Sequence, residues 1–223
     1  MKNLNQKCRL VAHPRCGGHW VNCLINLYIH KIDFKDYIHN GKNNVCIHTH
    51  DAKLLEKYKN IIYLYRNPVD KIYSTCCFYV KNPEYTYGFQ KRYYVDDIFD
   101  KGTIIKHINF YIDNINKWIF QDNFTDKKTV ISYDLLVNNF DSEFLKILNH
   151  FEKQFDADNI VRIKEISKLD IKKKDNQKRI INTSSNYNDN KKIFRNKMTS
   201  FIWENIKNKN ENVFKFLQGE ILL

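Results

Sequence analysis

Arg15, Gly17 and Gly18 lie where the sequence can build a site for an anion. Pro14–Gly18 is typical of a turn between a short buried strand and a helix that begins near His19. The first amides of such a helix have no internal acceptor, so an anion in the turn would contact backbone N–H groups and the Arg15 guanidinium. The alternative is an ordinary turn with incidental glycines. No Lys-Ser or Lys-Thr pair follows the glycines, which disfavours an ATP- or GTP-binding loop.

Two histidines farther along the chain share one side of a predicted strand. Alternate side chains of Val45–His50 would lie on the same face, so His48 and His50 point the same way. A His-x-His pair on a strand can bind zinc. Further ligands would have to come from the glycine turn and its borders: His13, Cys16 and His19. An anion explains that turn better, so we expect no metal.

A second motif begins with a continuous apolar run. Asn60–Tyr65 is predicted as a strand that is buried on both faces of a parallel sheet. The run breaks at Arg66–Pro68, and a helix is expected to follow.

Together the two motifs resemble the nucleotide-binding signatures of the PAPS-dependent sulfotransferases. Pro14–Trp20 is similar to a Pro-Lys/Arg-Ser-Gly-Thr-Thr-Trp loop, and Tyr65–Ser74 is similar to an Arg-Asn-Pro-x-Asp…Ser motif. The resemblance implies an α/β, P-loop-NTPase-like fold with three layers, in which helices flank a central parallel sheet. It also implies that the donor is 3′-phosphoadenosine 5′-phosphosulfate (PAPS) and that the product is PAP.

The resemblance also implies which residues bind the donor. Arg15 would counter charge on the bridging oxygen, beside the amides of Cys16–His19. Arg66 and Ser74 would hold the 3′-phosphate, and Trp20 would stack near the adenine. The full predicted set is Arg15, Cys16, Gly17, Gly18, His19, Trp20, Arg66, Ser74, Tyr133 and Arg195.

The last two members of this set come from later motifs. Tyr133 matches the tyrosine of a Tyr-Glu-Asp-Leu type motif that lies near the adenosine in the family. Phe194–Lys197 is similar to an Arg-Lys-Gly motif that folds over the cofactor. Arg195 would therefore close over the 3′-phosphate, with Asn196 as a secondary candidate.

Catalytic roles follow from the same resemblance. His48-Thr49-His50 is similar to the family's Lys-Thr-His element, in which the histidine takes the proton of the acceptor hydroxyl. His50 is thus the predicted base, and an imidazole pKa of about 6.5 suits that role. His48 replaces the lysine, and Arg15 completes the catalytic set. Gly18 and His19 stand where the family has hydroxyl residues.

Two long segments are predicted as loops. Residues 75–95 are rich in Phe and Tyr, and these rings either form a small core under the loop or line an acceptor pocket. Residues 168–197 carry ten basic and three acidic residues. They are predicted as a mobile basic lid, with a solvated linker as the alternative.

Apolar spacing predicts the remaining elements. Residues 31–42 are expected to form a loop or a short helix, and 129–133 a strand. Helices are expected over 51–58, 95–103, 104–120 and 142–151. A closing pair of helices is expected within 198–223, with Thr199 or Ser200 as the first N-cap.

Length and composition suit one soluble, cytoplasmic domain over residues 1–223. The chain has a mass of 26.9 kDa, which fits a single α/β core. Met1–Cys8 lacks the apolar centre of a leader, and no apolar run approaches the roughly 20 residues needed to cross a membrane. The six cysteines form no Cys-x-x-Cys pair and are expected as free thiols.

The net charge of +12 leaves several partners open. A polyanionic cofactor, an acidic acceptor, nucleic acid or Lys-rich coding would each account for it. We predict a sulfotransferase that acts on a hydroxyl or amine of a small-molecule, carbohydrate or tyrosyl acceptor. The alternatives are a catalytically degenerate member that binds a nucleotide or partner, and a basic nucleic-acid-binding protein.

Overall fold

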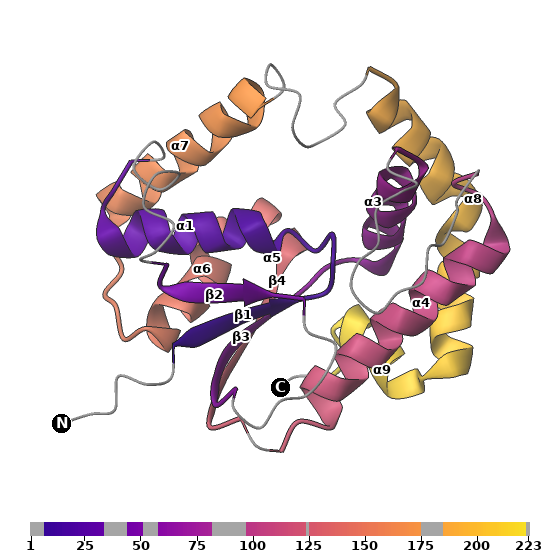
Figure 1. Ribbon diagram of the computed structural model, residues 1–223, viewed down its shortest axis with the longest axis horizontal. Helices are drawn as coiled ribbons and strands as arrows, with labels where there is room; N and C mark the ends of the chain where they lie inside the picture. Colours follow the sequence, from indigo (N-terminus) through magenta and orange to yellow (C-terminus); the bar gives the residue numbers. More distant parts are fainter. Residues whose placement is uncertain are drawn as a thin grey trace. The chain divides into compact units, whose positions relative to one another are not determined.

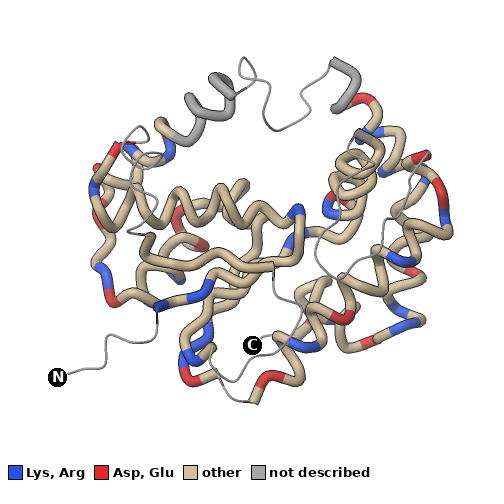
Figure 2. The backbone as a smooth tube through the Cα atoms, in the orientation of Figure 1, with Lys and Arg blue, Asp and Glu red and all other residues tan. Residues whose placement is uncertain are grey.

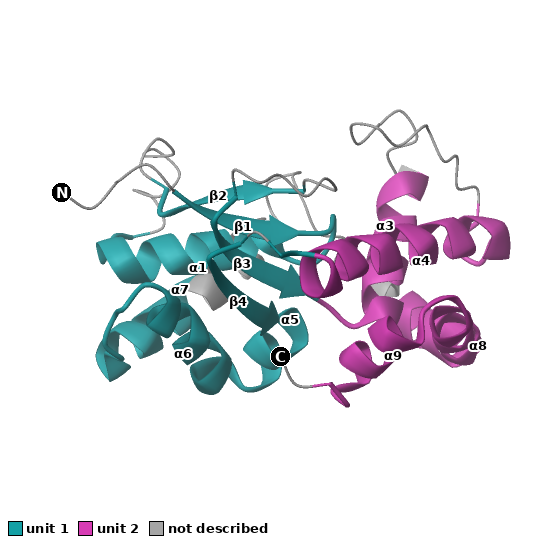
Figure 3. Cartoon of the chain, turned by 90° about the horizontal axis from the view of Figure 1, so that it is seen from below, with its two compact units in different colours: residues 1–65, 122–183 teal, residues 66–121, 184–223 magenta. Residues whose placement is uncertain are grey.

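The computed structural model describes residues 7–33, 44–50, 58–81, 97–123, 125–174 and 185–221. The chain divides into two compact units, each built from two segments (Figure 3). Unit 1 comprises Met1–Tyr65 and Asp122–Thr183, and unit 2 comprises Arg66–Gln121 and Ser184–Leu223. The expectation of one domain stays a prediction.

Unit 1 contains a four-stranded parallel sheet in the order β2-β1-β3-β4 (Figure 1). Its strands are β1 (Cys8–Ala12), β2 (Cys46–Thr49), β3 (Asn60–Tyr65) and β4 (Lys127–Ser132). The chain forms β2 on one side of β1 and then β3 on the other, so the connections diverge between β1 and β3. Ligands of open parallel sheets bind outside the carboxyl ends of the strands at such a point.

Helices cover this sheet. They are α1 (Gly18–His30), α5 (Tyr133–Asn138), α6 (Phe140–His150) and α7 (Ala157–Lys174). The first packs against β1 and β2, α6 packs against β4, and α7 packs against α1. Ile61 to Leu64 of β3 have no exposed surface, so both faces of that strand are covered. The prediction of an α/β fold with a central parallel sheet flanked by helices is confirmed.

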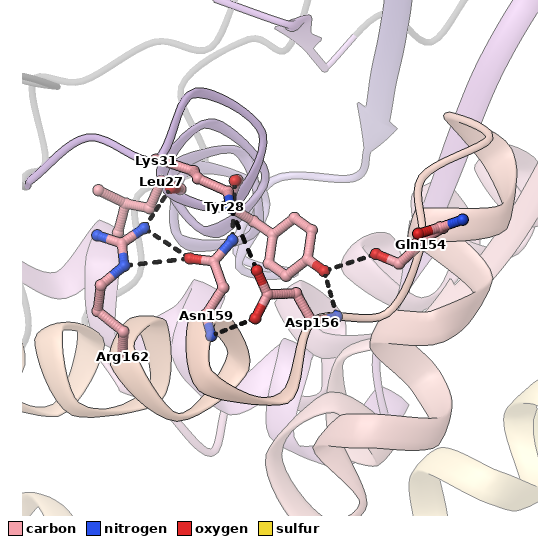
Figure 4. A network of polar contacts seen from close by, with 7 residues as sticks. All are labelled: Leu27, Tyr28, Lys31, Gln154, Asp156, Asn159 and Arg162. Carbon is pink, nitrogen blue, oxygen red and sulfur yellow. Dashed lines mark hydrogen bonds and ion pairs between the residues drawn. The ribbon is translucent and has the colours of Figure 1, made fainter.

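Helix α1 buries Val21, Leu24, Ile25 and Tyr28 at helical spacing, and polar contacts fix its end (Figure 4). The Tyr28 hydroxyl donates to the Gln154 carbonyl at 2.8 Å and accepts from the Asp156 amide at 2.9 Å. Arg162 donates to the Leu27 carbonyl at 2.8 Å. These contacts join the end of α1 to the start of α7 and so support the helix whose other end borders the glycine turn.

Unit 2 is helical in its described part. It contains α3 (Pro68–Lys81), α4 (Lys101–Ile115), the π-helical turn η2 (Asn116–Phe120), α8 (Ser185–Lys209) and α9 (Glu211–Gln218). Helices α3 and α4 pack against each other and against α8, and α9 packs against α8. The Tyr73 and Phe194 rings, 5.2 Å apart, join α3 to α8.

Both predicted loops are partly wrong. Residues 75–81 continue α3, because buried Ile72, Tyr73, Cys76 and Tyr79 extend a helical apolar face. Residues 168–174 belong to α7, and 185–197 belong to α8. Residues 82–96 and 175–184 lie outside the described residues.

Other boundaries also differ. Residues 97–100 form a turn instead of a helix, and Asp100 caps α4 by accepting from the Thr103 amide. The predicted N-cap at Thr199 or Ser200 is wrong, since α8 runs through both residues. The second closing helix begins after Asn210, whose side chain accepts from the Val213 amide. The predicted helix over 51–58 lies outside the described residues except for its last position.

The state of the cysteines and the apolar character of the helices were also predicted. All six cysteines are free thiols, as predicted. Within the described ranges, no helix combines the length and the apolar character that a bilayer crossing requires.

Candidate functional site

The turn between β1 and α1 has a backbone that requires glycine at one position. Gly17, at the N-cap of α1, has a φ of 89°, and Arg15 has a φ of 71°. A Cβ added at Gly17 would also overlap the ring edge of Tyr133. A residue with a side chain would therefore both strain the backbone and displace Tyr133.

The start of α1 has the electrostatics of an anion site. Gly17 has no side chain with which to cap the helix, and the first turn carries no acidic residue. The amides and the dipole of this end therefore favour a negative charge in the turn. Arg15 is half-buried in the same turn and adds a full positive charge. The turn thus has features that would favour an anion, and the donor site itself stays a prediction.

Three imidazoles form a cluster, the histidine cluster, beside this turn. His19 comes from the first turn of α1, His48 from β2, and His50 follows β2 directly. The ring centroid of His48 lies 4.5 Å from the centroid of His19 and 4.5 Å from that of His50. The His19 and His50 centroids are 6.3 Å apart. The prediction that His48 and His50 point the same way is confirmed.

One side of the His50 ring is fixed by the sheet. Its Nδ1 lies 2.7 Å from the carbonyl oxygen of Ala12, the last residue of β1. A carbonyl only accepts, so Nδ1 carries the proton and Nε2 carries the lone pair. Burial lowers the pKa of His50, the Ala12 hydrogen bond opposes that effect, and the charges of His19 and Arg15 lower it further. The ring is therefore neutral at pH 7, with a basic nitrogen.

His48 is held in a drier position. Burial, followed by the charges of His50 and His19, lowers its pKa to about 3. Its Nε2 is buried and has no hydrogen-bond partner in the described part of the chain. A Cβ added at Gly18 would lie 2.7 Å from His48 Cδ2 and closer still to Nε2. Sequence reasoning missed this contact, because Gly18 and His48 belong to separate motifs.

The aromatic residues assigned to the adenosine also meet in unit 1. The Trp20 and Tyr133 rings are in edge contact at 5.6 Å. Tyr133 is the first residue of α5, which Ser132 caps by accepting from the Leu135 amide. The Nε1 of Trp20 is buried without a hydrogen-bond partner among the residues described. Unit 1 thus contains the glycine turn, His48, His50, Trp20 and Tyr133, which come from separate parts of the sequence prediction.

The Arg66-Asn67-Pro68 motif has a structural function in unit 2. The Asn67 side chain accepts from the Val69 amide at 3.0 Å, which caps α3, and Pro68 is the first residue of that helix. The Tyr111 hydroxyl donates to the Arg66 carbonyl at 2.5 Å. Arg66 thus has a firmly held backbone immediately after β3. Ser74 is buried on α3.

Arg195 lies on α8 and binds a carboxylate of α3. Its Nε and a terminal nitrogen donate to the two oxygens of Asp70 at 2.8 and 2.6 Å, and Lys191 lies 2.8 Å from the same carboxylate. Burial acts to raise the pKa of Asp70, but the hydrogen bonds and charges of Arg195 and Lys191 outweigh it and lower that pKa. Asp70 was not predicted as a partner of Arg195. Asn196 is exposed.

Comparison with known proteins identifies the family. A model of the sulfotransferase domain matches residues 42–218, a range that begins after the glycine turn. No curated protein sequence matches this chain. The crystal structure of mouse sulfotransferase SULT7A1 complexed with PAP is similar at 17% identity and a TM-score of 0.49, over 73% of this chain and 64% of that chain. The chain thus spans less than two thirds of the length of that protein. Because the domain match covers well over half of its residues, the chain belongs to the sulfotransferase domain family.

Proposed function

We propose that this protein transfers a sulfuryl group from PAPS to a hydroxyl or amine of an acceptor, with His50 as the general base. The observation that carries the proposal is the hydrogen bond between His50 Nδ1 and the Ala12 carbonyl, because it leaves the lone pair on Nε2. That nitrogen belongs to a neutral imidazole in the same unit as the anion-binding turn. A base and a site for the donor's anionic end are the two requirements of the reaction.

The turn suits the sulfated end of the donor. Sulfuryl transfer, like phosphoryl transfer, proceeds in line with charge spread over the equatorial oxygens, so the protein contributes mainly position and neutralisation. We assign the phosphosulfate to the turn with Arg15, Cys16, Gly17, Gly18 and His19. The resemblance of the two motifs makes PAPS the donor to test first.

The proton and charge balance of the step can be assigned to named atoms. The acceptor oxygen forms a bond to sulfur while the bond from sulfur to the bridging oxygen breaks. The acceptor proton passes to His50 Nε2, and Arg15 counters the charge left on the bridging oxygen. A general base placed in this way contributes roughly 10²- to 10⁴-fold to the rate.

The remaining donor contacts are proposed from the resemblance. Arg66, Ser74 and Arg195 would hold the 3′-phosphate, and the edge pair of Trp20 and Tyr133 would meet the adenosine. We assign the reaction to the cytoplasm, where free thiols such as the six found here persist. The acceptor is a small molecule, a carbohydrate or a tyrosyl peptide.

His50→Ala tests the assignment. Transfer of labelled sulfate from PAPS to a panel of phenols, sugars and tyrosyl peptides should fall about 10²-fold or more, while PAP affinity measured by calorimetry stays near wild type. His30→Ala, which changes an exposed histidine at the other end of α1, should leave both quantities unchanged. Equal transfer by His50→Ala and the wild type would refute the role of His50.

A catalytically degenerate member is the second candidate. The observation that favours it is the close approach of His48 to Gly18, because both positions depart from the motifs that the sequence resembles. PAP binding without turnover on the whole panel would support this candidate. Nucleic-acid binding is less favoured, because Figure 2 shows Asp and Glu positions interspersed with the Lys and Arg positions along the described backbone.

A further inference from the structure

We propose that the histidine cluster, His19, His48 and His50, is a binding site for Zn²⁺. One ring nitrogen of each histidine lies within 4.8 Å of the corresponding nitrogen of the other two. Four-coordinate zinc with Zn–N bonds of about 2.0 Å places its ligand nitrogens about 3.3 Å apart. The rings therefore need to close by up to about 1.5 Å, and the exposed His19 side chain has room to make that adjustment.

Two features of the cluster match a metal site in particular. Histidines that bind metals usually donate their other ring N–H to a carbonyl or carboxylate, which orients the ring and fixes the tautomer. His50 does this through the Ala12 carbonyl. His48 presents a buried Nε2 with no hydrogen-bond partner among the described residues, and coordination would satisfy that atom.

The ligand type selects the ion. Imidazoles favour zinc, copper and nickel, whereas magnesium and calcium prefer oxygen ligands. Three protein ligands leave the fourth position of a tetrahedral site for water or an oxyanion. Arg15, whose charge acts on His50, would favour an oxyanion there. His13 and Cys16, considered from sequence, are not members of the cluster in the described structure.

The site has a consequence for transfer, which rests on the proposed function. The lone pair of His50 Nε2 cannot bind a metal and accept a proton at the same time. Zn²⁺ should therefore inhibit sulfate transfer by His50, and a chelator should restore it. Metal binding itself does not depend on that function and is measured without nucleotide.

The test is calorimetric titration of the full chain with Zn²⁺, together with the visible absorption of the Co²⁺-substituted protein. We expect one ion per chain, a four-coordinate Co²⁺ spectrum, and no comparable binding of Mg²⁺. His19→Ala, which changes the exposed ligand, and His48→Ala should each weaken Zn²⁺ binding by at least about tenfold. His30→Ala is the matched control and should bind as wild type does.

Gly18→Ala gives a sharper test because it keeps all three histidines. The added Cβ would overlap the His48 ring, so this variant should also lose at least about tenfold in Zn²⁺ affinity. Wild-type affinity in Gly18→Ala or in both histidine variants, or a six-coordinate Co²⁺ spectrum, would overturn the metal site. PAP affinity measured in chelator reports on the proposed function separately, so failure of one proposal is distinguishable from failure of the other.

Discussion

The His48 ring fills the space in unit 1 that a side chain at Gly18 would occupy. A side chain on Gly18 would place its Cβ 2.7 Å from His48 Cδ2, inside the distance that real Cβ atoms keep. An imidazole in this position at 48 therefore requires glycine at 18. The resemblance places a hydroxyl residue at position 18 and a lysine at position 48. The two departures from the motifs are thus coupled in space, because the His48 ring lies where a side chain at position 18 would be.

A double-mutant cycle tests whether positions 18 and 48 are coupled in this way. Gly18→Ala should lower the free energy of unfolding by about 1–3 kcal/mol, because it forces the His48 ring aside. In a His48→Ala background the same change should raise it by up to about 1 kcal/mol, since Gly18 lies in α1 without the positive φ of Gly17. Urea unfolding of the four proteins measures both effects. The same sign in both backgrounds would contradict the shared space.

The local parts of the site were predictable from the sequence. Helical spacing after Gly18 and the alternation of His48 with His50 depend only on neighbouring residues, and the structure has both. Contacts between Gly18 and His48, or between Gly17 and Tyr133, depend on the order of the strands in the sheet. No local pattern encodes that order, so these contacts appeared only in the structure.

The start of the long helix α8 was wrongly predicted as a loop because of its composition. The basic segment around Lys191 was predicted as a loop because lysine and asparagine dominate it. Phe194, Met198, Ile202 and Ile206 are nevertheless buried at intervals of four residues, which is the apolar stripe of α8. A search for that spacing across the predicted loop boundary would have found the helix.

The fall of kcat/KM at acid pH should report the protonation of His50. Its pKa is lowered mainly by burial, so the ring stays neutral to a lower pH than a free histidine. A base must be neutral to accept a proton, so kcat/KM should hold through pH 6.5 and fall only below it. His19→Ala removes a charge that lowers this pKa and should move the fall to higher pH. A midpoint above 6.5 in the wild type would argue against His50 as the base.

Tyr28 should stabilise unit 1 through its hydroxyl. Tyr28→Phe leaves the Gln154 carbonyl and the Asp156 amide without that partner, at an expected cost of about 1–3 kcal/mol in the free energy of unfolding. Thermal or urea unfolding measures the loss. PAP affinity should remain near wild type, because Tyr28 lies near the end of α1 opposite the glycine turn. A large loss of affinity with normal stability would place Tyr28 in another role.

Asp70 should make the stability of unit 2 depend on acid. Its folded-state pKa is lowered by Arg195 and Lys191 against the effect of burial, so its contribution is present above pH 3.8 and is lost as pH falls through the folded value. Asp70→Asn should reduce the free energy of unfolding at pH 7 by about 2 kcal/mol and flatten its pH dependence. Glu211→Gln, which changes an exposed carboxylate paired with Lys215, should alter stability little.

Asp70→Asn also separates two possible roles of Arg195. In the folded protein the guanidinium is paired with Asp70, so a 3′-phosphate would have to compete with or share that carboxylate. If Arg195 binds the phosphate, Arg195→Ala should weaken PAP binding, whereas Asp70→Asn should leave it unchanged or strengthen it. Calorimetry at pH 7 compares the two variants. Equal losses of PAP affinity in both variants would show that Arg195 acts only through its pairing with Asp70. If the guanidinium binds the phosphate directly, removing the Asp70 carboxylate should instead strengthen that binding.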